Sequence, residues 1–147
     1  MLKNKLKESV EKLVGKTLSD LNLACEMIML DFEGCHIHSQ CFTRIIYNND
    51  IILTTLDYQN WDGINNQNND EWYNLSKHKN LIVNNKVKKS KLTPTNDLLI
   101  ELENNVQIQL YVSNGLTHFE EEQEQWRYFK ISKEDEPHIV IYSTKIE

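Results

Sequence analysis

The sequence has little glycine and little proline, with four residues of the first kind and two of the second in 147. Phosphate-binding loops such as G-x-G-x-x-G need clustered glycines, because the backbone must approach the phosphate closely. Here the glycines are scattered, at positions 15, 34, 63 and 115. The motifs H-E-x-x-H and G-x-S-x-G are also absent. The sequence therefore favours a non-catalytic protein over an enzyme of these classes.

Targeting and membrane segments are missing as well. No apolar run approaches the roughly 18 residues of a membrane span. Residues 1–14 carry charges throughout and contain no apolar stretch typical of a signal peptide. The three cysteines, Cys25, Cys35 and Cys41, are an odd number, which is typical of reduced thiols. We expect a cytoplasmic protein that does not bind membranes.

Basic charge is in deficit, because 16 Lys and Arg face 22 Asp and Glu, for a formal net charge of −6. Nucleic acids and anionic membranes attract basic surfaces, so we expect neither as a partner. The one basic cluster contains Lys86, Lys88, Lys89 and Lys91. It has no interleaved aromatic residue and is typical of a strand near a sheet edge. The length indicates a single domain over residues 1–147, and no cofactor is indicated.

Hydrophobic periodicity predicts a helix over residues 2–14, packed on the protein's own sheet or on a partner. Apolar residues then alternate over 24–32 and 35–47, with Glu33-Gly34 as a two-residue hairpin loop between the two strands. The register that gathers the apolar set on one face pairs Phe32 with Cys35, Leu30 with Ile37 and Ile28 with Ser39. A third strand is expected over 51–58.

The second half of the chain continues this pattern. Capping residues predict a helix over 69–79, and strands are expected over 87–92, 98–102 and 106–112. A three-residue loop, Glu103 to Asn105, places Leu102 opposite Val106, whereas a two-residue loop would place it opposite Gln107. We therefore expect the three-residue loop, with Asn105 in the left-handed conformation.

A last hairpin is expected from 126–129 and 138–142, joined by the charged turn 133–137. Together these elements predict an α+β fold, which is mainly an antiparallel sheet or half-barrel. An N-terminal helix and one or two short helices accompany the sheet.

One group of residues has metal-ligand chemistry. In the expected register Asp31 lies opposite His36, and His38 lies two residues further on the same face. Two imidazoles and one carboxylate can hold a metal ion or small ligand. The alternative is an Asp–His pair on a solvated face. Cys35 and Cys41 point to the opposite face and cannot join the histidines.

An acidic run precedes an aromatic segment near the C-terminus. Clustered carboxylates steer basic partners, and the alternative is an ordinary solvated loop. The candidate partner-binding residues are Glu120, Glu121, Glu122, Glu124, Trp126 and Arg127. A basic protein such as a nucleic-acid-attacking toxin fits this charge.

Residues 97–110, DLLIELENNVQIQL, together with Gln125 to Phe129 and Pro137-His138-Ile139-Val140, form a recurring pattern. It resembles a family of small uncharacterised bacterial proteins with an Asp-Leu-x-Ile strand pair followed by Trp-Arg and Pro-His-Ile-Val segments. His38 to Ile45 is similar to the family's His-x-Gln-x-x-Trp-Arg strand, with Thr43 where a Trp is often expected. The resemblance covers most of the chain after residue 13 and includes no catalytic signature. Such a family implies no established activity, but some small proteins of this kind accompany polymorphic toxins as immunity proteins.

The leading hypothesis is thus a non-catalytic protein-binding domain, of the kind that inhibits toxins. The alternative is a metal- or small-ligand-binding domain centred on Asp31, His36 and His38. Homodimerisation through the N-terminal helix or an open strand edge is compatible with either hypothesis.

Overall fold

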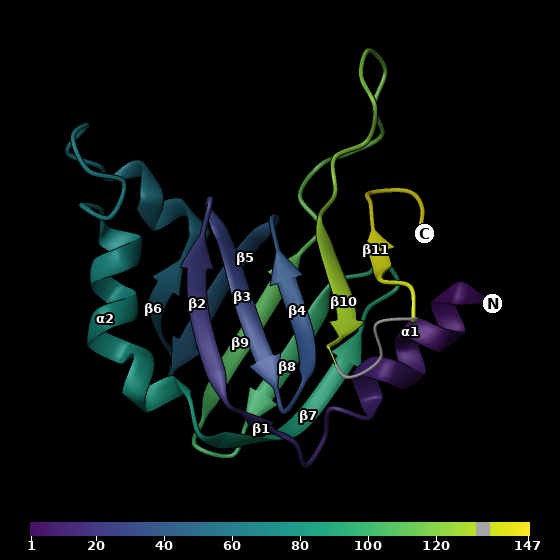
Figure 1. The fold of residues 1–147 in the computed structure, drawn as a ribbon, viewed down its shortest axis with the longest axis horizontal. Helices are drawn as coiled ribbons and strands as arrows, with labels where there is room; N and C mark the ends of the chain where they lie inside the picture. Colours follow the sequence, from purple (N-terminus) through teal and green to yellow (C-terminus); the bar gives the residue numbers. More distant parts are fainter. Residues whose placement is uncertain (132–135) are drawn as a thin grey trace.

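A computed structural model describes residues 1–131 and 136–147 and shows an α+β fold built on two antiparallel sheets (Figure 1). In the described residues, the five-stranded sheet has the order β11-β10-β4-β3-β2 and the six-stranded sheet the order β1-β7-β8-β9-β5-β6. The strands of the first sheet are β2 (Asp20–Ala24), β3 (Met27–Phe32), β4 (Cys35–Ser39), β10 (Trp126–Lys130) and β11 (Ile139–Ile141). Those of the second are β1 (Thr17–Leu18), β5 (Phe42–Tyr47), β6 (Asp50–Thr54), β7 (Asn85–Leu92), β8 (Leu98–Leu102) and β9 (Val106–Tyr111).

The core lies between the two sheets. Alternate residues of the strands are buried, and side chains from both sheets, such as Ile37 and Ile108, belong to one apolar cluster. Helix α2 (Asp70–Ile82) packs against β6 of one sheet and β2 of the other, so it covers one side of the sandwich (Figure 1). Helix α1 (Leu2–Glu11) packs on β7 at the opposite side. No helix in the described residues is long and apolar enough to cross a bilayer.

Two hairpin predictions are confirmed. Strands β3 and β4 pair with Phe32 opposite Cys35, and the Glu33-Gly34 loop has positive φ at both residues, as a tight hairpin of this twist requires. Strands β8 and β9 are joined by the three-residue loop 103–105, in which Asn105 has φ of 68°. Apolar residues face each other across both pairs, because any other register would expose part of the core set.

Two expected strands are broken in the structure. Residues 24–32 do not form one strand, because Cys25 and Glu26 adopt φ of 50° and 63° and form a turn between β2 and β3. Neither residue is a usual left-handed residue, so the sequence did not indicate this turn. Residues 35–47 are also interrupted, since the chain passes from the five-stranded to the six-stranded sheet between β4 and β5.

The ends of other elements differ as well. The third strand ends at Thr54, whose side chain forms a capping box with Asp57 and begins the 3-10 helix η1 (Thr55–Gln59). Helix α1 ends at Glu11, and Leu13 is buried in the following turn whereas Val14 is exposed. The last hairpin is confirmed as the β10–β11 pair. Most of the predicted charged turn between these strands, 133–135, lies outside the described residues.

Candidate functional site

A histidine-rich patch covers part of the outer face of the five-stranded sheet. Strand β10 pairs with β4 so that Phe129 lies opposite His36 and Arg127 opposite His38. The Phe129 ring stacks on His36 at 5.2 Å and on His138 at 4.2 Å between centroids, and His38 approaches it edge-on at 4.9 Å. The sheet therefore gathers three imidazoles around one phenyl ring.

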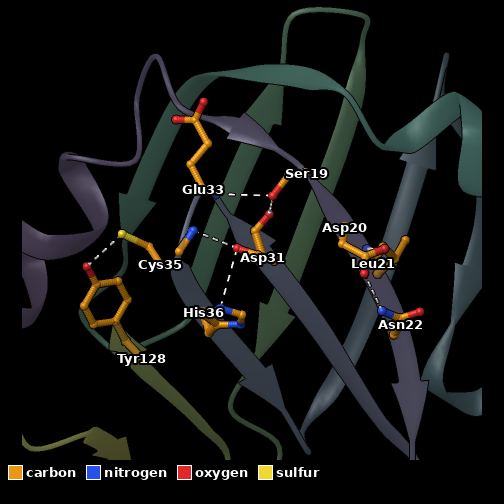
Figure 2. A network of polar contacts seen from close by, with 10 residues as sticks. Ser19, Asp20, Leu21, Asn22, Asp31, Glu33, Cys35, His36 and Tyr128 are labelled. Carbon is orange, nitrogen blue, oxygen red and sulfur yellow. Dashed lines mark hydrogen bonds and ion pairs between the residues drawn. The ribbon is translucent and has the colours of Figure 1, made fainter. Parts of the chain in front are cut away.

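Asp31 has a structural task at the edge of this patch. Its Oδ1 accepts a hydrogen bond from the Gly34 amide at 2.9 Å and lies 3.6 Å from His36 Nε2 (Figure 2). The carboxylate thus closes the β3–β4 turn and also contacts the imidazole. The cross-strand pair predicted from the sequence is present.

The metal hypothesis has no support in this geometry. His38 stands 6.3 Å from His36 between ring centroids, with their planes at 86°, and Phe129 contacts both rings. Among the described residues, no group of three His, Cys, Asp or Glu side chains is arranged to hold a metal ion. Burial, followed by the positive charge of His36 and Arg127, holds the pKa of His38 below its usual value. The patch therefore favours a neutral, packed His38.

The predicted partner-binding residues divide into two groups. Trp126 is fully buried, and its Nε1 donates to the Asn96 carbonyl at 2.9 Å, so its inclusion in a surface was wrong. Arg127 forms a two-pronged ion pair with Glu124 and lies 3.0 Å from His138 Nδ1. Glu122 accepts a hydrogen bond from the Thr144 hydroxyl.

The remaining two glutamates, Glu120 and Glu121, lie on the segment between β9 and β10, residues 112–125, which projects from the sandwich (Figure 1). We call it the projecting loop. Its tip exposes two large apolar side chains, Leu116 at 83% and Phe119 at 93%. Sequence reasoning missed both, although an apolar pair beside four glutamates was a visible signal.

The base of the projecting loop is firmly held, whereas its tip is free. Buried Gln125 accepts backbone hydrogen bonds from Gln40 and Cys41 at 2.8 and 2.9 Å, and its side chain accepts from the Ser113 amide at 2.8 Å. Residues 114–121 make no hydrogen bond to the described part of the chain. The strands thus hold the base of the loop, and within the tip the rings of His118 and Phe119 lie edge to face at 4.6 Å.

One depression adjoins the base of the projecting loop, and a second depression adjoins the first. The first, of about 500 Å³, is lined by Gln123 and Glu124 of the loop together with Leu56, Tyr58 and Glu26. The second, of about 430 Å³, shares Glu26 and Tyr58 with the first and extends to α2. No lysine or arginine among the described residues lines either depression. This end of the molecule, the acidic end, therefore combines the projecting loop with two depressions of negative character.

None of the described cysteines is arranged to act as a nucleophile. Burial raises the pKa of the Cys41 thiol to about 11, so it stays protonated at neutral pH. Cys35 is buried and accepts a hydrogen bond from the Tyr128 hydroxyl at 3.5 Å (Figure 2). Cys25 is exposed in the β2–β3 turn.

No protein-family model, curated protein or solved structure matches this chain. The functional proposal therefore rests on the geometry, and the resemblance to the bacterial family stays a prediction.

Proposed function

We propose that this protein is a non-catalytic binding domain that attaches to a basic protein through the projecting loop. The observation that carries the proposal is the pair of exposed side chains, Leu116 and Phe119, directly followed by Glu120 and Glu121. Protein interfaces commonly have apolar anchors at the centre and charges at the rim. The loop tip has this composition, and the one ring contact it makes in the described residues is local, between His118 and Phe119.

The charge of the acidic end supports a basic partner. Glu120 and Glu121 have no ion-pair partner among the described residues, and Glu26 lies on the rim shared by the two depressions. Complementary charge accelerates association and excludes acidic competitors. Proteins that attack nucleic acids need basic surfaces to reach phosphates, so an acidic inhibitor suits them. An immunity-type inhibitor that meets such a toxin in the cytoplasm is the specific role proposed here.

The partner to test is a basic toxic domain, which the proposal expects to be encoded beside this protein's gene. We expect the double variant Leu116→Ser/Phe119→Ser to bind it at least roughly tenfold more weakly, since anchors of this kind contribute about 2 kcal/mol or more. Ile51→Ser is the matched control, because Ile51 is also apolar and exposed, at 55%, but lies on strand β6. Isothermal titration calorimetry with purified proteins measures both.

Electrostatic steering gives a second measurement on the same complex. Glu120→Gln/Glu121→Gln should slow association at low salt and have little effect at high salt, where charges are screened. Unchanged binding by all loop variants, or a genomic neighbour without any toxic domain, would contradict the proposal.

A further inference from the structure

A buried carboxyl group without a partner lies at the start of α2. Glu71 is the second residue of the helix, and its side chain is 0% exposed. Neither of its carboxylate oxygens has a hydrogen-bond partner in the structure. Buried polar atoms in proteins are almost always hydrogen-bonded, because an unpaired one loses its interaction with water without compensation. Glu71 is therefore placed for something other than stability.

Glu71 lines the second depression of the acidic end. The walls are formed by the aromatic side chains Tyr58 and Trp72, by Glu26 and Cys25 of the β2–β3 turn, and by Asn66 and Gln67. Burial, followed by the negative charges of Asp57 and Glu26, raises the pKa of Glu71 to about 7. The described lining residues therefore offer negative charge and aromatic rings, and none of them is a cation that would neutralise Glu71.

The carboxylate and the aromatic rings of this depression favour one kind of cation over another. A planar guanidinium group pairs with both oxygens of one carboxylate and packs against aromatic rings. An ammonium group is a point charge that needs neither feature. The described residues contain no group of three His, Cys, Asp or Glu side chains arranged to hold a metal ion, which favours an organic cation.

We propose that this depression, the Glu71 pocket, binds a guanidinium group that pairs with the Glu71 carboxylate, with Tyr58 and Trp72 lining its sides. Because both Glu71 oxygens are buried in this structure, the side chain must turn toward the depression when the group binds. Where Glu71 is still protonated, binding ionises it and the proton is released to solvent. The group belongs either to an arginine side chain of a protein or to a small alkylguanidine. The proposal does not require the projecting loop to bind anything, although the two depressions share Glu26 and Tyr58.

The first experiment uses propylguanidinium as the probe and butylammonium as the matched cation, in calorimetric titrations of the full chain. We expect 1:1 binding of propylguanidinium that is about tenfold tighter at pH 8 than at pH 6, because a group with a pKa of about 7 is mostly ionised only at the higher pH. Butylammonium should bind clearly more weakly. Absent propylguanidinium binding, or equal binding of the two cations, would overturn the proposal.

Variants assign the binding to the pocket. Glu71→Gln keeps the size of the side chain and should abolish binding at both pH values. Glu26→Lys places a competing cation on the exposed turn at the rim and should abolish binding without disturbing the core. Glu33→Gln, on the β3–β4 turn, is the control and should bind as the parent does. Retained binding by Glu71→Gln or Glu26→Lys would overturn the assignment.

Cys25 supplies an independent readout. It is exposed and lines the Glu71 pocket, whereas Cys35 and Cys41 are buried. Saturating propylguanidinium should therefore slow alkylation of Cys25 by iodoacetamide, as measured by mass spectrometry. An unchanged rate at saturation would place the ligand elsewhere.

Two further titrations identify the source of the group. A capped Gly-Arg-Gly peptide that binds more tightly than agmatine indicates an arginine side chain of a protein. The reverse order indicates a small guanidine compound. If neither compound binds, the proposal is overturned. That result would not affect the proposal that the projecting loop binds a basic partner.

Discussion

Trp126 and Glu71 are both fully buried, and each side chain carries a polar group, but the surroundings of these groups differ. The indole of Trp126 donates to the Asn96 carbonyl and fills the core, so burial stabilises the fold. Glu71 has no such partner, and the negative charges of Asp57 and Glu26 act against its ionisation. At the scale of single residues, one position supports the fold whereas the other costs stability.

Glu71 lowers the stability of the fold only over a defined range of pH. In the folded protein Glu71 keeps its proton up to about pH 7, whereas the ordinary value of 4.5 applies in the unfolded chain. The folded state therefore holds the extra proton between these values, and the free energy of unfolding falls as the pH rises from about 4.5 to about 7. Below this range the group is protonated in both states and has no such effect.

Replacing Glu71 by glutamine removes this titration. We expect Glu71→Gln to be more stable than the parent at pH 8, by on the order of 1 to 3 kcal/mol, and nearly equal to it at pH 4. Urea unfolding at pH 4, 6 and 8 measures the difference, with the exposed Glu33→Gln as control. A difference that is the same at all three pH values would show that Glu71 does not titrate in this range.

At the scale of elements, the two confirmed hairpins depend on left-handed residues in their loops. The β8–β9 loop ends at Asn105, with φ of 68°, directly before Val106 begins β9. Asparagine tolerates this conformation, whereas a β-branched residue does not. The length of the loop and the register of the strands therefore depend on the residue at this position.

A substitution at Asn105 tests this dependence. We expect Asn105→Val to lower the free energy of unfolding by about 1 to 2 kcal/mol, because it forces strain at a positive φ. Asn105→Gly should be neutral or slightly stabilising, since glycine adopts the conformation freely. Thermal denaturation of both variants gives the comparison. Equal stability of the valine and glycine variants would contradict the proposed role of the left-handed residue.

At the scale of the whole molecule, one core connects every layer. Leu6 and Val10 of α1, Leu75 of α2 and Trp126 of β10 belong to the same buried cluster as the strands of both sheets. Neither sheet has a separate core of its own. The two sheets and the two helices should therefore be stable only together.

This continuity predicts cooperative unfolding. We expect urea curves from far-ultraviolet circular dichroism and from tryptophan fluorescence to coincide, as for a two-state domain. Leu6→Ala should move both curves together to lower urea concentration. We expect the free energy of unfolding to fall by about 2 to 5 kcal/mol, because the Leu6 side chain is fully buried. A fluorescence transition separate from the dichroism transition would mean that the two sheets unfold independently.

Local sequence patterns were enough to predict the elements that have a clear periodicity, turn or cap in their own residues. The 2-residue alternation and the Glu33-Gly34 loop were enough for the β3–β4 register, and Asn69 was enough for the start of α2, where its side chain accepts from the Trp72 amide at 3.0 Å. The turn at Cys25 gave no such signal, whereas the alternating Leu21 and Leu23 of β2 carried one that was missed. Glu71 was overlooked for a different reason, because glutamate is rarely buried without a partner. Glu71 lies four residues before Leu75, on the same buried face of α2.

Sequence periodicity accounts for the α+β class, the apolar faces and the pairing of neighbouring strands, because these depend on interactions between residues a few positions apart. The order of the strands and the surroundings of the candidate sites depend on contacts between distant segments. Phe129 reaches His36 through the β4–β10 pair, and Tyr58 joins Glu71 and Cys25 around one pocket. No local propensity encodes such contacts. They arise from burying one shared core, which brings distant side chains together at its rim.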